Sequence, residues 1–89
     1  LLTECMAKAG IEAGLPPKLA AQLARATVAG AGAMLVVSPE EPKKLRENVT
    51  SPGGTTEAAL NVLMAPDALP SLMTKAIAAA TKRSHELAQ

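Results

Sequence analysis

The chain has 89 residues, of which nine are basic, eight are acidic and 48% are apolar, and it contains no Phe, Tyr or Trp. A net charge of +1, with no clustered basic face and no aromatic rings to stack on bases, argues against a nucleic-acid-binding protein. A domain of this size buries only about 60% of its unfolded surface, so we expect the surplus apolar surface to be covered in an obligate oligomer.

The first predicted element is a helix over residues 1–13. Gly14 suits its C-terminal cap, and Pro16-Pro17 enforces a break behind it. The helix begins without a capping residue and the chain begins without a methionine. We therefore expect the chain to be a piece of a longer protein.

A long helix is predicted next, over residues 16–37, and its polar face disappears in its second half. Residues 26–37 are almost entirely apolar, which predicts burial on all sides. This run is about half of the roughly 20 residues that cross a bilayer, so we expect a core helix and no membrane contact. Gly30 and Gly32 each cost about 1 kcal/mol in a helix interior, so packing must offset them and this helix should be central.

The segment Gly30-Ala31-Gly32 resembles the start of a dinucleotide-binding fingerprint. The pattern fails, because Leu35 stands where the third glycine is needed and no strand is predicted before the segment. A nucleotide site is therefore not expected here.

A turn with the sequence Ser-Pro-Glu-Glu-Pro follows, and Ser38 or Glu41 could cap the short helix predicted over residues 42–48. Two further helices are predicted over residues 55–64 and 68–87. Asp67 is a plausible N-cap of the last helix, and no segment has the alternation of a strand. The fold is predicted to be all-α, with about five helices.

Cys5 and His85 have reactive side chains, but neither is predicted to form a catalytic or metal site. Cys5 is the single cysteine, so no disulfide or cysteine-based metal site is expected within one chain, and a reducing, cytoplasmic compartment fits. His85 is the single histidine and is expected to lie exposed on the last helix. No metal site and no Ser/His/Asp arrangement is recognisable.

The candidate site is the segment Thr50–Thr56, which places Pro52, two glycines and four hydroxyl groups directly before a predicted helix. Glycines allow close backbone approach to a ligand, and the first turn of a helix leaves its N–H groups free for an anion. The backbone amides of Gly54, Thr55 and Thr56 could thus bind a carboxylate. The alternative is that the segment is only a tight connection. A phosphate-binding P-loop is excluded, because Thr55 stands where that motif needs a lysine.

At these residues the chain resembles the C-terminal dimerisation domain of pyrroline-5-carboxylate reductase. The Ser-Pro-Gly-Gly-x-Thr core is the most specific part of the resemblance, which runs nearly from end to end. The matching motifs are Ala9-Gly10-x-x-x-Gly14-Leu15-Pro16, Ala29-Gly30-Ala31-x-Ala33-Met34-Leu35, Pro42-x-x-Leu45-Arg46-x-x-Val49 continuing into Thr50–Thr56, and Ala79-Ala80-x-x-Arg83-Ser84-x-Glu86-Leu87.

The resemblance implies a reductase that forms L-proline by hydride transfer from NADPH or NADH to the C=N bond of pyrroline-5-carboxylate. It implies an all-α domain of the type found at the C-terminus of 6-phosphogluconate dehydrogenase, assembled as an interlocked homodimer or a ring of dimers. Substrate-carboxylate contacts would fall to Gly54, Thr55 and Thr56. The Thr56 hydroxyl would contact the ring nitrogen and is the candidate proton donor.

Two departures from the family pattern stand out. The N-terminal Rossmann domain that binds the nucleotide is expected to lie outside residues 1–89, so this chain alone should be inactive. Pro66-Asp67 replaces the glycines that are usual between the last two helices. The alternative function is a non-enzymatic helical oligomerisation module.

Overall fold

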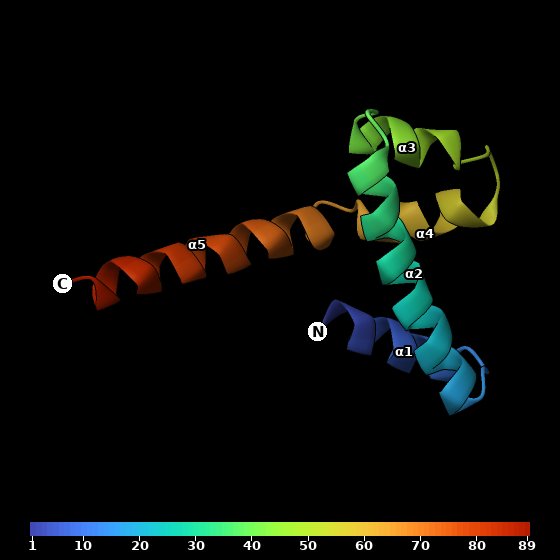
Figure 1. Ribbon diagram of the computed structural model, residues 1–89, viewed down its shortest axis with the longest axis horizontal. Coiled ribbons are helices and arrows are strands. Elements are labelled where there is room, and N and C mark those ends of the chain that lie inside the picture. The colour runs from blue at the N-terminus through green and yellow to red at the C-terminus, as the bar shows by residue number, and fades with distance from the viewer. The chain divides into compact units, whose positions relative to one another are not determined.

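The computed structural model describes residues 1–89, and every regular element in it is a helix, as predicted. The five helices begin and end close to their predicted limits and follow one another along the chain (Figure 1). They are α1 (Leu2–Glu12), α2 (Pro17–Val37), α3 (Pro42–Asn48), α4 (Thr55–Leu63) and α5 (Leu69–Leu87). The chain divides into two compact units, residues 1–42 and 43–89.

In the first unit, α1 and α2 form a helical hairpin whose turn is fixed at Gly14. Gly14 has φ +108°, a left-handed conformation that glycine adopts without steric cost. The Gly14 N–H donates to the carbonyl of Ile11 at 3.0 Å, and the Leu15 N–H donates to the carbonyl of Gly10 at 3.0 Å. These two bonds form a Schellman motif, so the predicted glycine cap of the first helix is confirmed.

The core of the hairpin is small and lies at the start of α2. Ala20 and Ala24 are the buried apolar residues, with 2% and 4% of their surface exposed. A Cβ added to Gly10 would lie 3.2 Å from Ala20 Cβ. The absence of a side chain at Gly10 therefore allows α1 to approach α2 closely.

The second half of α2 is not buried within the single chain, and here the prediction of burial on all sides is wrong for the isolated chain. Val36 and Val37 are 85% and 81% exposed, and Met34 and Leu35 are also exposed. The physical reason is that α1 is too short to cover more than the first half of α2. By length and composition α2 could also cross a membrane, but the core helix of a soluble protein passes the same test, so this is weak evidence.

In the second unit, α3 and α4 are joined by the candidate turn. The guanidinium of Arg46 in α3 donates to the sulfur of Met64, the C-cap residue of α4, at 3.4 Å. The Thr50 hydroxyl donates to the carbonyl of Arg46 at 2.6 Å and so closes the end of α3. The first bond thus joins α3 to the end of α4, and the second fixes the end of α3 ahead of residues 51–54.

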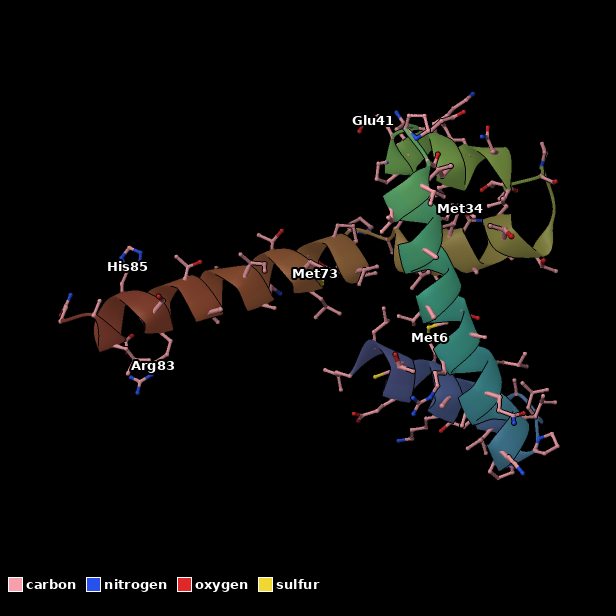
Figure 2. The ribbon with its side chains drawn as sticks, in the orientation of Figure 1. Met6, Met34, Glu41, Met73, Arg83 and His85 are labelled. Carbon is pink, nitrogen blue, oxygen red and sulfur yellow. The ribbon has the colours of Figure 1, made fainter.

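The last helix, α5, has no buried residue. Its side chains project from the helix, as Met73 and His85 illustrate in Figure 2. The predicted capping role of Asp67 is wrong, because the N-cap is Ala68 and no side chain bonds to the helix start. The Ala68 N–H donates to the carbonyl of Ala65 at 2.9 Å, and this turn leaves Asp67 outside the helix.

The predicted capping of α3 by Ser38 or Glu41 is wrong, because Ser38 is the C-cap residue of α2 and neither side chain bonds to an N–H of α3. The Ser38 hydroxyl accepts a hydrogen bond from the Glu40 N–H at 3.2 Å, ahead of the helix. This is a local turn of the kind that serine favours before a helix. Figure 2 shows Glu41 near the same bend.

Candidate functional site

Residues 51–54 form a tight β-turn that precedes α4. The Gly54 N–H donates to the carbonyl of Ser51 at 3.0 Å, Pro52 occupies the second position, and Gly53 occupies the third with φ +72°. Proline followed by a residue with positive φ is typical of a type II turn. Pro52 thus favours the turn and Gly53 suits the positive φ of its third position.

Gly54 is both the end of this turn and the N-cap of α4. It has an extended conformation, with φ −87° and ψ 178°, and its carbonyl accepts the first helical bond from the Ala58 N–H at 3.2 Å. A Cβ added to Gly54 would lie 3.1 Å from the carbonyl oxygen of Ser51. A side chain at Gly54 would therefore crowd the turn, whereas Gly53 supplies the positive φ of its third position.

The first turn of α4 leaves backbone donors free. No side chain caps the helix, and the N–H groups of Thr55, Thr56 and Glu57 have no acceptor within the chain. The structure thus brings Thr55 and Thr56 together at a helix start, as the sequence predicted. The N–H of Gly54, the third predicted contact, is already engaged with Ser51.

The four hydroxyl groups of the segment differ in their surroundings. Thr50 is engaged with the carbonyl of Arg46. Thr55 and Ser51 are exposed, whereas Thr56 is half-buried and its hydroxyl makes no hydrogen bond within the chain. Thr56 is therefore the threonine of the segment that is half-buried and also has a hydroxyl group free to bind a ligand.

Glu57 is a residue of the site that the sequence analysis did not identify. Its Oε1 accepts a hydrogen bond from the Gly53 N–H at 3.1 Å. A glutamate three residues after an N-cap is the spacing of a capping box, in which the carboxylate bonds to the N–H of the N-cap residue. Here the N–H of the N-cap Gly54 is engaged with Ser51, and Glu57 bonds one residue earlier, to Gly53. This spacing was present in the sequence and could have identified the contact.

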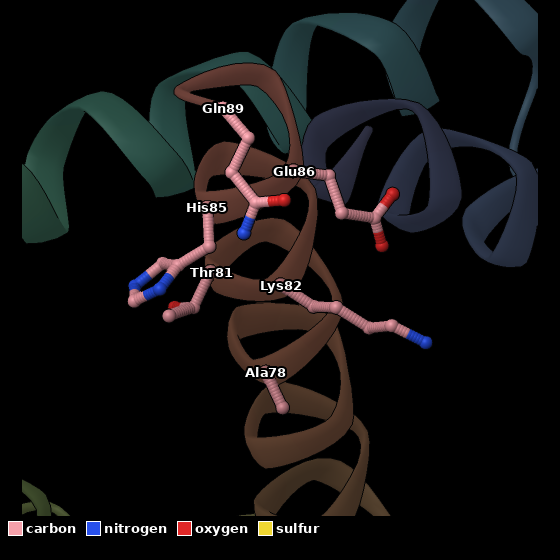
Figure 3. A pocket seen from close by; sticks show the side chains of 6 residues that line it. All are labelled: Ala78, Thr81, Lys82, His85, Glu86 and Gln89. Carbon is pink, nitrogen blue, oxygen red and sulfur yellow. The ribbon is translucent and has the colours of Figure 1, made fainter.

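The other candidate residues lie outside this site. His85 is exposed on α5, beside a hollow lined by Ala78, Thr81, Lys82, His85, Glu86 and Gln89 (Figure 3). All six residues belong to α5 and its C-terminal end, so this hollow is an open helix surface. Arg83, on the same helix, pairs with Glu86 at 3.3 Å. Cys5 is exposed on α1, and the chain holds no group of three His, Cys, Asp or Glu that could bind a metal ion.

Comparison with known families identifies the chain's relatives. The family described as pyrroline-5-carboxylate reductase dimerisation matches residues 1–87. The chain belongs to this family. The helical fold, the glycine-dependent hairpin of α1 and α2 and the Pro-Gly-Gly turn before α4 are thus features of a dimerisation domain.

Individual relatives agree with the family match. The chain is 46% identical over 87 residues to pyrroline-5-carboxylate reductase of Pisum sativum, covering 98% of the chain. It is 45% identical over 89 residues to the reductase of Arabidopsis thaliana and 43% identical over 89 residues to that of Pseudomonas aeruginosa. In each case the chain spans 32% of the relative's length, about a third of these curated proteins.

Proposed function

We propose that the chain is the dimerisation and substrate-binding domain of a pyrroline-5-carboxylate reductase, the enzyme that forms L-proline in the last step of proline biosynthesis. The observation that carries this proposal is the Thr50–Thr56 turn, in a chain that belongs to the dimerisation family. The turn offers free backbone donors and a free, half-buried hydroxyl side by side. These are the groups that a cyclic imine with a carboxylate substituent requires.

The substrate carboxylate would bind at the start of α4. The N–H groups of Thr55 and Thr56 point out of the first helical turn, where the helix dipole adds partial positive charge. Gly54 contributes in two ways. Its N–H closes the turn on Ser51, and its lack of a side chain lets the carboxylate come close to the backbone of the first helical turn. The carboxylate would thereby be oriented by backbone groups alone.

The Thr56 hydroxyl would act on the ring nitrogen. Reduction of a C=N bond leaves a basic nitrogen that must carry a proton, and a positioned hydroxyl can donate it or hold the nitrogen in place. Thr56 suits this role because its hydroxyl has no competing partner in the chain. Thr56 is the residue of this chain that we assign to catalysis.

The nucleotide would be bound elsewhere in the full-length protein. The chain consists of five helices and has no strand. It therefore does not form the glycine-rich βαβ unit that binds NADPH or NADH. We place that unit in an N-terminal domain of the parent protein, and the chain by itself would be inactive. The single, exposed cysteine fits a cytoplasmic enzyme.

The partner in the proposed assembly is a second copy of the chain. The second half of α2 and the length of α5 carry exposed apolar side chains, among them Val36, Val37, Leu72 and Ile77. A domain with so little buried core needs such surface to be covered. A homodimer, alone or in a ring of dimers, would cover it.

The test of the proposal is the kinetics of Thr56 variants in the full-length parent protein. Thr56→Ala should lower kcat for pyrroline-5-carboxylate reduction by about tenfold or more, because proton donation or positioning is lost. Thr56→Ser keeps the hydroxyl and should retain most of the activity, and Thr55→Ser is the control at the neighbouring position. Wild-type kinetics in Thr56→Ala would remove its catalytic role. A parent protein with no reductase activity would favour a non-enzymatic oligomerisation module in which the turn is only a connector.

A further inference from the structure

Glu57 differs from every other acidic residue of the chain. Of the eight aspartates and glutamates, Glu57 alone is half-buried, and the other seven are exposed. It is also the carboxylate that bonds to the backbone of the candidate turn, through the Gly53 N–H at 3.1 Å. Its position next to a site for an anion is unexpected on charge alone, because a carboxylate there repels a substrate carboxylate.

The hydrogen bond explains what Glu57 contributes in return. Two adjacent glycines form the most flexible stretch of backbone that a chain can have, and ordering them costs more entropy than ordering other residues. Within the turn, the Gly54 N–H is held by the carbonyl of Ser51 and the Gly53 N–H is held by Glu57. Without Glu57, one of the two glycine amides has no partner in the chain.

The contact also links the turn to the helix that carries the free donors. Glu57 is the third residue of α4, so its side chain reaches back over the first turn to Gly53. The carbonyl of Gly54 bonds to the Ala58 N–H on the same turn of the helix. The turn and the start of α4 are thus tied at two points, and the N–H groups of Thr55 and Thr56 are held between them.

We propose that Glu57 is a positioning residue, which preorganises the carboxylate-binding amides of Thr55 and Thr56 by holding the Gly53 N–H. The inference rests on the proposed function of the turn. The entropy of ordering the two glycines is then lost on folding instead of on substrate binding, which lowers the KM for the carboxylate substrate. Glu57 touches neither the substrate nor the nucleotide in this role.

The test compares three variants of the full-length parent protein. Glu57→Ala removes the acceptor, and the KM for pyrroline-5-carboxylate should rise about fivefold, the effect of losing one hydrogen bond of ordinary strength. The kcat and the KM for the nucleotide should stay unchanged. Glu57→Gln keeps an amide oxygen as acceptor and removes the charge, so it should stay within about twofold of the wild type. Glu47→Ala, which removes an exposed carboxylate from α3, is the matched control.

Amide exchange at Gly53 gives a readout that does not depend on activity. Its rate, measured by NMR or fragmentation mass spectrometry on the same proteins, should rise in Glu57→Ala and match the wild type in Glu57→Gln. The inference is overturned if Gly53 exchanges equally in the wild type and in Glu57→Ala, or if Glu57→Gln is as impaired as Glu57→Ala. Equal losses in kcat and both KM values would also overturn it, since they indicate a general folding defect. If the wild type lacks reductase activity, the proposed function fails, whereas the Gly53 exchange rates still decide whether the tether exists.

Discussion

Gly10 of α1 faces Ala20 of α2 at a distance at which a side chain on Gly10 would crowd Ala20. A Cβ at Gly10 would lie 3.2 Å from Ala20 Cβ and 3.4 Å from Leu15 Cδ1. Ala20 is the most buried residue of the chain, and Leu15 follows the glycine cap of α1. The contact therefore joins the core of the hairpin to its turn. In the sequence Gly10-x-x-x-Gly14, the first glycine allows the close contact with α2 and the second forms the turn.

Replacing Gly10 by leucine should lower the free energy of unfolding by about 1–3 kcal/mol, because the larger side chain overpacks the contact with Ala20. Lys8→Leu introduces the same side chain at an exposed position of α1 and should change the stability by less than about 0.5 kcal/mol. Urea denaturation of the parent protein, followed by circular dichroism, measures both. Equal stability of the two variants would mean that the close approach of α1 and α2 is not maintained in solution.

The turn at Gly53 gives a second prediction. Gly53→Ala places a side chain at φ +72° and should destabilise the protein by about 1–2 kcal/mol. Gly53→Asn should cost less, because asparagine adopts this left-handed conformation more readily than alanine. The same denaturation experiment ranks the three proteins. An alanine variant as stable as the wild type would contradict the type II turn.

The comparison of sequence and structure separates local signals from those that need a neighbour. The cap at Gly14 and the helix start after Gly54 were predictable, because backbone conformation there depends on a few adjacent residues. Asp67 was misplaced as an N-cap because Pro66 and Asp67 are the two central residues of a turn that the Ala68 N–H closes on the carbonyl of Ala65. The Thr50–Thr56 turn was located as a whole, but which of its amides are free depends on which carbonyl each one meets.

Burial could not be predicted in the same way. The apolar pattern of residues 26–37 requires a covering surface, but it does not say whether that surface comes from the same chain. In the structure α1 covers only the region of Ala20 and Ala24. The structure of a single chain therefore does not explain why the second half of α2 is apolar.

This uncovered surface leads to a prediction about mass. In light scattering at micromolar concentration the chain should have twice the mass of the monomer, because its exposed side chains include Met34, Val36 and Val37. The measurement should be repeated over a tenfold dilution series to detect dissociation. A monomeric mass throughout would refute the homodimer.

A substitution on α2 can test where the partner packs. Nothing within the chain lies within 4 Å of a Cβ at Gly30, and leucine is a better helix former than glycine, so Gly30→Leu should not destabilise the monomer. If the thin part of α2 packs against a second copy, the added side chain should weaken the dimer by about tenfold or more through overpacking. Lys18→Leu adds the same side chain on the polar face of α2 and should leave the dimer intact. Analytical ultracentrifugation gives both dissociation constants, and an unchanged constant for Gly30→Leu would move the interface away from this segment.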